Sequence, residues 1–309
     1  MNIKFLKECD YKYHNSGNVL VSDKEYDILK DMLRKEHPND PYFNTVGAPV
    51  AGSAVQLPYI LGSLNKAKPD GSFLKWCNDD NITMLAVSDK LDGVSIYTKY
   101  VDGILVQAST RGDGYEGKDI TNKIKMKHPT CKGDGIQEFR GEAVMTDANC
   151  EKLGYSLPRS AVSGILNGDG IEHIDKMKYV DLVFYTPLGV TGPENWPSMW
   201  YLIEKSELPC VNYYVMNVTT MAENILEKQY KLRQAVSDWA IDGLVCANYY
   251  DTSVGEDYYP ANIMAFKVNE KPVKCYVQKV VWETKRSGNV KPVVHFDPTM
   301  IGGSMVSKA

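Results

Sequence analysis

Short runs rich in apolar and β-branched residues, separated by polar residues and glycines, recur along the chain from about residue 82, and this pattern predicts β-strands. The runs that we expect to be strands lie at 84–87, 95–98, 104–106, 138–144, 182–185 and 242–245. Asp102 and Gly103 separate two of these runs and predict a tight hairpin. Strands joined by short turns favour antiparallel sheets, so we expect an α+β domain.

Two segments have apolar residues at helical spacing instead. In the first, residues 22–25 form a cap followed by acidic residues, and apolar side chains recur at positions 26, 29, 32 and 33. Prolines and glycines at 38–49 end that helix. The second helical segment covers 222–239. We therefore place a small helical domain at residues 1–55 and the α+β domain at 56–272.

A further pair of strand-like runs lies near the end of the chain. The runs at 277–282 and 290–296 flank Ser287-Gly288-Asn289, which predicts a hairpin in the segment 273–309. This hairpin is expected to open a β-barrel that the chain is too short to complete. Because open strand edges attract other strands, we expect either a shortened chain or a subunit completed by a second polypeptide.

Composition narrows the class of protein. The 309 residues exceed the usual size of one hydrophobic core, and 43% hydrophobic with 24% charged residues is ordinary for a globular protein. The net charge of −4 excludes a surface that coats nucleic acid everywhere but allows a local basic groove. No apolar run spans a bilayer, and the first ten residues do not resemble a signal peptide. Seven cysteines without a C-x-x-C pair predict reduced thiols in a cytoplasmic protein and no structural zinc.

The strongest chemical signal is Lys90-Leu91-Asp92-Gly93, where a lysine at a strand end precedes an acid and a turn glycine. A lysine acts as a covalent nucleophile when neighbouring cations or loss of solvent leave its amine partly neutral. An ordinary lysine has a pKa of about 10.4, so well under ~1% is neutral without such help. The alternative interpretation is an exposed lysine in a turn.

Other motifs follow in the chain, each with a structural alternative. Glycines around Arg111 in 110–114 allow the guanidinium to approach a phosphate or ribose, or form a plain surface loop. Glu142 offers a carboxylate to ribose hydroxyls or pairs with an edge-strand cation. Lys267 meets a phosphate as a point charge or is solvated on its strand. Asp242 opens the run at 242–245.

In this order and spacing the motifs resemble the nucleotidyltransferase core of bacterial-type NAD-dependent DNA ligases. The best stretch runs from 90–95 through 110–121, and the resemblance covers nearly the whole chain. It implies ATP-grasp-like antiparallel sheets, an N-terminal helical domain and the first strands of an OB-fold, with 280–293 resembling the start of that fold. It also implies that Lys90 attacks the α-phosphorus of NAD⁺ and forms a lysyl-AMP intermediate.

The resemblance implies two groups of binding residues as well. Those expected to bind AMP are Ser63, Leu64, Asp92, Arg111, Glu142, Arg159, Tyr185, Asp242 and Lys267. Tyr185 is the expected partner of the adenine ring, with Phe184 as the alternative. Mg²⁺ is implied, because displacement at phosphorus needs charge neutralised on the non-bridging oxygens. No residue is assigned as a metal ligand.

The second group is expected to bind nicotinamide mononucleotide and distinguishes NAD⁺ from ATP as the substrate. It consists of Tyr13, His14, Asp23, Tyr26 and Asp27. An aromatic ring stacks on nicotinamide, and carboxylates meet its positive ring or its ribose hydroxyls. The alternative is a helix cap and a tyrosine in a hydrophobic core.

The chain departs from the family at several positions. Ser88 stands where the family has a glutamate, with Asp89 beside it, and Asn167 and Ala247 replace an expected arginine and lysine. Arg233 lies one residue out of register with another expected arginine. These departures predict a divergent enzyme, either from a bacterial cell or encoded by a virus, with a weakened grip on phosphate.

The resulting prediction is the adenylation module of an NAD-dependent DNA ligase, with nicked double-stranded DNA as its partner. The zinc and helix-hairpin-helix regions of the family are absent, so we expect self-adenylation but little nick sealing by this chain alone. Two alternatives remain, namely an ATP-dependent polynucleotide ligase and a scaffold subunit that has lost catalysis.

Overall fold

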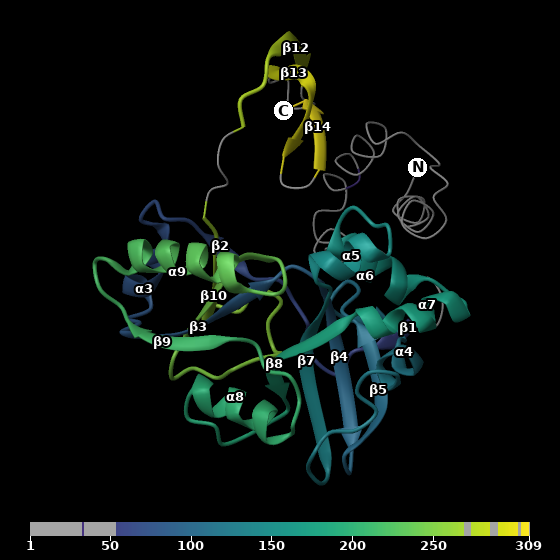
Figure 1. Cartoon of the computed structure of the whole chain (residues 1–309). Helices are drawn as coiled ribbons and strands as arrows, with labels where there is room; N and C mark the ends of the chain where they lie inside the picture. The colour runs from purple at the N-terminus through teal and green to yellow at the C-terminus, as the bar shows by residue number, and fades with distance from the viewer. Residues whose placement is uncertain (1–32, 34–53, 269–272, 285–289, 302–303, 309) are drawn as a thin grey trace.

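The computed structural model describes residue 33 and residues 54–268, 273–284, 290–301 and 304–308. The expected nicotinamide site lies outside these described residues, and so does almost all of the predicted helical domain at 1–55. The described core contains two sheets with helices packed around them (Figure 1). This mixed architecture confirms the predicted combination of helices and largely antiparallel sheets.

The first sheet has four antiparallel strands in the order β5-β4-β7-β8. These strands are β4 (Val94–Val101), β5 (Ile104–Thr110), β7 (Ile136–Val144) and β8 (Asp181–Leu188). Asp102 and Gly103 join β4 to β5 with φ angles of 49° and 74°. Positive φ at both turn residues matches the right-handed twist of the strands, so the predicted hairpin is confirmed.

The second sheet has five strands in the order β2-β11-β10-β3-β9. They are β2 (Asn65–Ala67), β3 (Met84–Leu91), β9 (Tyr213–Asn217), β10 (Ile241–Asn248) and β11 (Ile263–Phe266). The β2 strand pairs in parallel with β11, and the other pairs are antiparallel. Strand β3 lies inside this sheet, where it pairs with β9 from Met84 to Ser88 and with β10 from Leu85 to Leu91.

Helices α3 (Ser72–Asp79) and α9 (Ala222–Val236) cover one face of the five-stranded sheet (Figure 1). Phe73 and Leu226 of these helices join Leu85 of β3 in one buried cluster. The helix predicted for 222–239 is confirmed, although it ends at Val236. Beyond that point the backbone forms an isolated bridge to the start of α5.

The remaining helices belong to the side of the four-stranded sheet (Figure 1). They are α4 (Thr121–Lys125), α5 (Asp147–Lys152), α6 (Pro158–Asn167), α7 (Ile171–Lys176), the 3₁₀ turn η2 (Met177–Tyr179) and α8 (Trp196–Lys205). Apolar residues of α6 and α8 share a large core with β4, β7 and β8. No described helix is long and apolar enough to cross a membrane.

Two small sheets complete the described structure. Strand β1 (Ala54–Gln56) pairs with β6 (Glu116–Lys118), and β12 (Val277–Thr284), β13 (Val290–Ile301) and β14 (Ser304–Lys308) form an antiparallel sheet. The pairing of β12 with β13 confirms the predicted C-terminal hairpin. Its assignment to an OB-fold, and the domain boundaries, stay predictions.

Candidate active site

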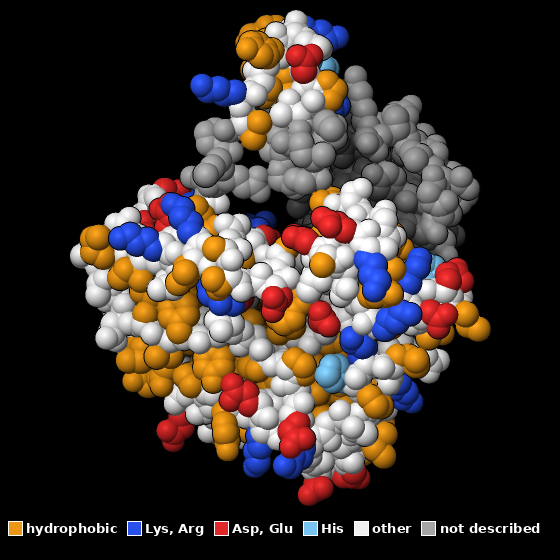
Figure 2. All heavy atoms as spheres, viewed as in Figure 1, with side chains coloured by type: hydrophobic (Ala, Val, Ile, Leu, Met, Phe, Trp, Pro, Cys, Tyr) orange, Lys and Arg blue, Asp and Glu red, His pale blue; other side chains and the backbone are white. Residues whose placement is uncertain are grey.

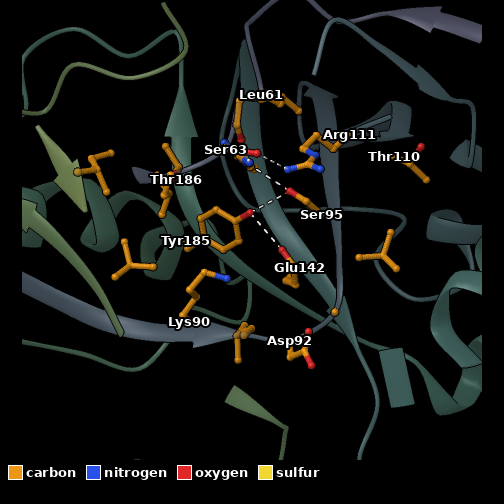
Figure 3. A pocket seen from close by; sticks show the side chains of 18 of the residues that line it. Leu61, Ser63, Lys90, Asp92, Ser95, Thr110, Arg111, Glu142, Tyr185 and Thr186 are labelled. Atoms are coloured by element: carbon orange, nitrogen blue, oxygen red, sulfur yellow. Dashed lines mark hydrogen bonds between the residues drawn. The ribbon is translucent and has the colours of Figure 1, made fainter. Parts of the chain in front are cut away.

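A pocket of about 1370 Å³ lies between the two sheets and takes its walls from both. Lys90 and all nine residues expected to bind AMP line this pocket, although they come from strands and loops distant in sequence. Figure 3 shows several of these side chains converging from different elements. The structure therefore brings the described candidate residues together, whereas the five expected nicotinamide contacts lie outside the described residues.

Strand alternation aims Lys90 into the pocket. Leu85 and Val87 of β3 pack into the core beneath α3 and α9, whereas Ala86, Ser88 and Lys90 line the pocket. Successive side chains of a strand point to opposite faces, so a lysine at this position leaves the core side. The side chain of Lys90 is 26% exposed, so its amine can be reached from the pocket.

Asp242 forms ion pairs with both Lys90 and Lys267. The Nζ atom of Lys90 lies 2.9 Å from Oδ1 of Asp242, and Nζ of Lys267 lies 2.7 Å from Oδ2. Burial would raise the pKa of Asp242, but the two lysines outweigh it and leave the pKa below its usual range. A register irregularity between Ile241 and Leu244 lies at this point of β10, and such bulges re-aim side chains.

The glycine of the lysine motif is required by a close approach between strands. A Cβ atom at Gly93 would lie 2.2 Å from the carbonyl oxygen of Ala143 on β7. The preceding Asp92 donates its backbone N–H to the Ala240 carbonyl, and its Oδ1 lies 3.0 Å from Nη1 of Arg159. The turn after Lys90 thus links both sheets to the first turn of α6.

Arg111 occupies the opposite wall of the pocket. Its Nη1 donates a hydrogen bond of 3.3 Å to Oγ of Ser63, and its backbone N–H donates to the Ser95 carbonyl (Figure 3). Gly112 has φ of 56°, and a Cβ there would meet the Glu116 carbonyl oxygen at 1.8 Å. A tight, glycine-dependent loop therefore fixes the guanidinium beside the pocket.

Glu142 forms the centre of a polar network on β7 and β8. The hydroxyl oxygen of Tyr185 lies 3.2 Å from Oε2 of Glu142 and 3.0 Å from Oγ of Ser95 (Figure 3). Arg140, to which the sequence analysis assigned no role, donates to Ser95 and to the Gly62 carbonyl. Loss of solvent raises the pKa of Glu142 to about 7, against the lowering effect of Arg140 and Lys90.

The two aromatic candidates for adenine lie on opposite faces of β8. Tyr185 lines the pocket, whereas Phe184 is fully buried and packs edge-on against Phe139. Alternation along the strand separates them. The pocket is also lined by Trp196, Trp200, Val254 and Ile263, to which the sequence analysis assigned no role, and by Val245 and Ala247 of β10. No short motif marks the first four, because they come from α8, β11 and the loop that precedes β11.

Two lysines hold the far end of α6. Lys123 of α4 is 9% exposed, and its ammonium donates to the carbonyls of Ile165 and Leu166 at 2.8 Å and to that of Gly168. Lys118 donates to the Asn167 carbonyl. Burial and the neighbouring Lys118 lower the pKa of Lys123. Lysine ammonium groups at a helix C-terminus stabilise the carbonyls that lack a helical partner.

Within the described ranges, no three histidine, cysteine, aspartate or glutamate side chains gather as a metal site. The carboxylates nearest Lys90 already pair with cations, Asp242 with two lysines and Asp92 with Arg159. Magnesium is often held by one or two carboxylates together with substrate phosphates. The residues present fit an ion of that kind and not one enclosed by protein ligands.

The sequence profile of the NAD-dependent DNA ligase adenylation domain matches residues 71–249, more than half of the chain. The chain belongs to this family. The match spans Lys90, Arg111, Glu142 and Asp242 of this adenylation domain, and it ends before Lys267. The family assignment identifies NAD⁺ as the nucleotide and adenylation of a lysine as the reaction of its members.

Relatives of the adenylation domain come from viruses and bacteria. A DNA ligase of Acanthamoeba polyphaga mimivirus is 33% identical over 92% of this chain and 45% of the viral protein. A DNA ligase of Flavobacterium psychrophilum is 26% identical over 97% of this chain and 50% of its own length. The chain thus spans about half the length of the curated relatives it matches.

Among solved structures, a bacteriophage T7 ATP-dependent DNA ligase in complex with ATP matches 79% of this chain and 78% of its own. The identity is 15% and the TM-score 0.41, which is too low to establish a common overall fold.

Proposed function

We propose that this adenylation domain takes AMP from NAD⁺ onto Nζ of Lys90 and releases nicotinamide mononucleotide. The observation that carries the proposal is the convergence of Lys90 and Lys267 on Asp242 at the pocket wall. Nζ of Lys90 loses a proton to solvent and forms a bond to the α-phosphorus. The bond between that phosphorus and the bridging oxygen breaks, and the leaving mononucleotide keeps the electron pair.

Asp242 acts in this proposal as a counter-ion and not as a proton acceptor, because its lowered pKa keeps it ionised at neutral pH. Its two oxygens hold the two lysine amines in fixed positions. An α-phosphate that enters the pocket competes with Asp242 for Lys267. Fixed cations aimed at the developing charge are a large source of rate acceleration in phosphoryl transfer.

The remaining pocket residues are proposed to bind the AMP moiety. Arg111 and Arg159 are proposed to bind phosphate or ribose oxygens, and Glu142 to accept hydrogen bonds from ribose hydroxyls. The ring of Tyr185 is proposed to contact adenine, with Ser63 and Leu64 beside it. The hydroxyl bonds of Tyr185 to Glu142 and Ser95 support this, because they fix the ring.

The expected contacts to nicotinamide belong to this proposal as well, namely Tyr13, His14, Asp23, Tyr26 and Asp27. Mg²⁺, when bound with the pyrophosphate of NAD⁺, would neutralise charge on its non-bridging oxygens. Glu142 pairs with no lysine or arginine within 4.0 Å in the described residues, so it is the carboxylate that would offer this ion an oxygen ligand.

Transfer of AMP to the 5′-phosphate of nicked DNA is the proposed fate of the lysyl-AMP. The viral and bacterial relatives are DNA ligases, which supports DNA as the partner. Because this chain matches about half of each relative, sealing is proposed for the chain together with the remaining regions, on the same or a second polypeptide.

Intact mass spectrometry tests the first step. The protein is incubated with Mg²⁺ and either NAD⁺ or ATP, and the mass is compared with that of Lys90→Ala. We expect the mass of one AMP to be added from NAD⁺ and none in Lys90→Ala. AMP transfer from ATP alone would favour an ATP-dependent ligase, and labelling of Lys90→Ala would overturn the role of Lys90.

A further inference from the structure

Four lysines and two tyrosines form two neighbouring groups of contacts on the helices beside the four-stranded sheet. The members of this lysine–tyrosine patch are Lys127, Lys152, Tyr155, Lys176, Lys178 and Tyr179. They come from α5, α7, η2 and the segments that follow α4 and α5. Figure 2 shows Lys and Arg side chains gathered over the region of α5, α6 and α7.

The tyrosine rings hold the lysine amines in place. Nζ of Lys152 lies 5.1 Å and Nζ of Lys178 lies 5.2 Å from the ring centre of Tyr179. Nζ of Lys176 lies 5.5 Å from the ring centre of Tyr155 and 3.2 Å from its hydroxyl oxygen. A cation over a ring face keeps its full charge while its long side chain is restrained. Less side-chain entropy is then lost when an anion binds.

The patch carries more positive than negative charge at close range. In the described part of the chain, no carboxylate oxygen lies within 4.0 Å of Lys152, Lys176 or Lys178, and Lys127 pairs with Asp181 at 3.7 Å. Two ammonium groups therefore share the Tyr179 ring without a carboxylate between them. Exposed acids such as Glu151 and Asp175 flank the patch and limit its width.

The patch begins close to the pocket. Tyr155 lies between α5 and α6, four residues before Arg159. Arg159 lines the pocket, and its side chain is 63% exposed. Lys152 of the patch, Arg159 at the pocket and Lys176 of the patch therefore lie on the successive helices α5, α6 and α7.

We propose that the lysine–tyrosine patch binds the phosphate backbone of double-stranded DNA that extends away from the pocket. The inference rests on the proposed function, which supplies DNA as the partner. A duplex presents regularly spaced phosphates, and several neighbouring ammonium groups neutralise several of them at once. Tyrosine hydroxyls add hydrogen-bond donors to phosphate oxygens without reading the base sequence.

The test measures binding of a nicked duplex to the full chain over a range of salt concentrations. The triple variant Lys152→Gln/Lys176→Gln/Lys178→Gln should reduce the slope of log affinity against log salt by about 2 to 3, since each lost phosphate contact removes about 0.9. The matched triple Lys75→Gln/Lys132→Gln/Lys231→Gln makes the same charge change at lysines with exposed side chains. It should leave the slope near that of the wild type.

The variant Lys152→Arg/Lys176→Arg/Lys178→Arg keeps the charge and should keep most of the slope, which separates charge loss from misfolding. Equal slopes for the wild type and the glutamine triple would overturn the proposal, and so would an equal loss in the matched control. Binding to anionic vesicles without binding to DNA would overturn it in favour of a membrane. Self-adenylation from NAD⁺ needs no DNA, so its presence in the glutamine triple shows that the proposed function still holds.

Discussion

Arg233 donates three hydrogen bonds to Asp89, the residue that immediately precedes Lys90. Nε of Arg233 lies 3.0 Å and 3.2 Å from the two carboxylate oxygens, and Nη2 lies 2.7 Å from Oδ2. The side chain of Asp89 is 5% exposed. The pair fastens the C-terminal half of α9 to the strand that carries the proposed nucleophile, at a residue that itself borders the pocket.

These two residues lie where the resemblance predicts two departures from the family pattern. It predicts a glutamate at the position of Ser88, one residue before Asp89, and an arginine one residue out of register with Arg233. The displaced acid and the displaced arginine meet in this structure. A bidentate contact of this type fixes orientation as well as distance.

We predict that Arg233→Met lowers the free energy of unfolding by about 3–5 kcal/mol, because it leaves a buried carboxylate without a partner. Urea denaturation checks this value. Lys231→Met on the same helix is a suitable control, since its side chain is 62% exposed and its pair with Glu227 should be worth about 1 kcal/mol or less. A double variant Asp89→Asn/Arg233→Met should regain most of the loss. A single-variant cost equal to that of the control would contradict the prediction.

We predict that Lys267→Met slows self-adenylation from NAD⁺ by roughly 100-fold with an unchanged fold, because one fixed cation is lost from the place where phosphate charge develops. Single-turnover kinetics by intact mass measure the rate. Lys75→Met, which removes an exposed lysine of α3, should adenylate at the wild-type rate. An unchanged rate in Lys267→Met would show that this amine does not meet the α-phosphate.

We predict that affinity for NAD⁺ rises about ten-fold between pH 6 and pH 8. The pKa of Glu142 is raised to about 7, and only the ionised carboxylate accepts two ribose hydroxyls. Isothermal titration of Lys90→Arg with NAD⁺ avoids turnover and keeps the positive charge beside Glu142. The same titration with Lys90→Arg/Glu142→Gln should show a flat profile, and a profile that keeps its slope would assign the titration to another group.

The same raised pKa has a consequence for stability. Folding favours the protonated form of Glu142, so this contribution is fully present below pH of about 4.5 and is lost as the pH rises through about 7. Relative to Glu142→Gln, the wild type should therefore lose unfolding free energy between pH 5 and pH 8. Urea denaturation at both pH values checks the sign, and a gain of stability in the wild type would contradict it.

We predict that Lys123→Met destabilises the protein by at least ~2 kcal/mol, since buried carbonyls that lose a partner cost about 1–3 kcal/mol each. Hydrogen exchange should show faster opening at the C-terminal end of α6 than elsewhere in the domain. Lys125→Met on the same short helix replaces an exposed lysine and should change neither measurement. Equal protection of α6 in both variants would mean that Lys123 does not hold this helix.

Local patterns were sufficient to predict several elements. The Asp102-Gly103 turn, the strands around 84–87 and 138–144 and the helix at 222–239 follow from turn chemistry and periodicity, which depend on neighbours in the chain. The exact end of α9 did not follow, because the isolated bridge beyond Val236 is a tertiary contact. Boundaries of elements depend on such contacts more than their existence does.

Some residues of the candidate site were also predictable from local patterns, whereas others became evident only from the structure. Lys90, Arg111 and Glu142 were found because each belongs to a motif with a recognisable order of residue types. Arg233 and Lys123 were not found as partners of Asp89 and α6, because nothing in their own neighbourhood marks them. Their roles depend on a second residue that lies 144 and 42 to 45 positions away.

By itself the sequence determined which residues are candidates for chemistry and, from local strand and turn patterns, that Lys90 lies at the end of a strand. Only the tertiary structure decided that Lys90 and Lys267 share the carboxylate of Asp242, that Phe184 is buried while Tyr185 faces the pocket, and that Arg233 reaches Asp89. The physical reason is that charge pairing and burial depend on distances in space. Those distances are set when the two sheets pack together, and short-range patterns of residue types do not contain them.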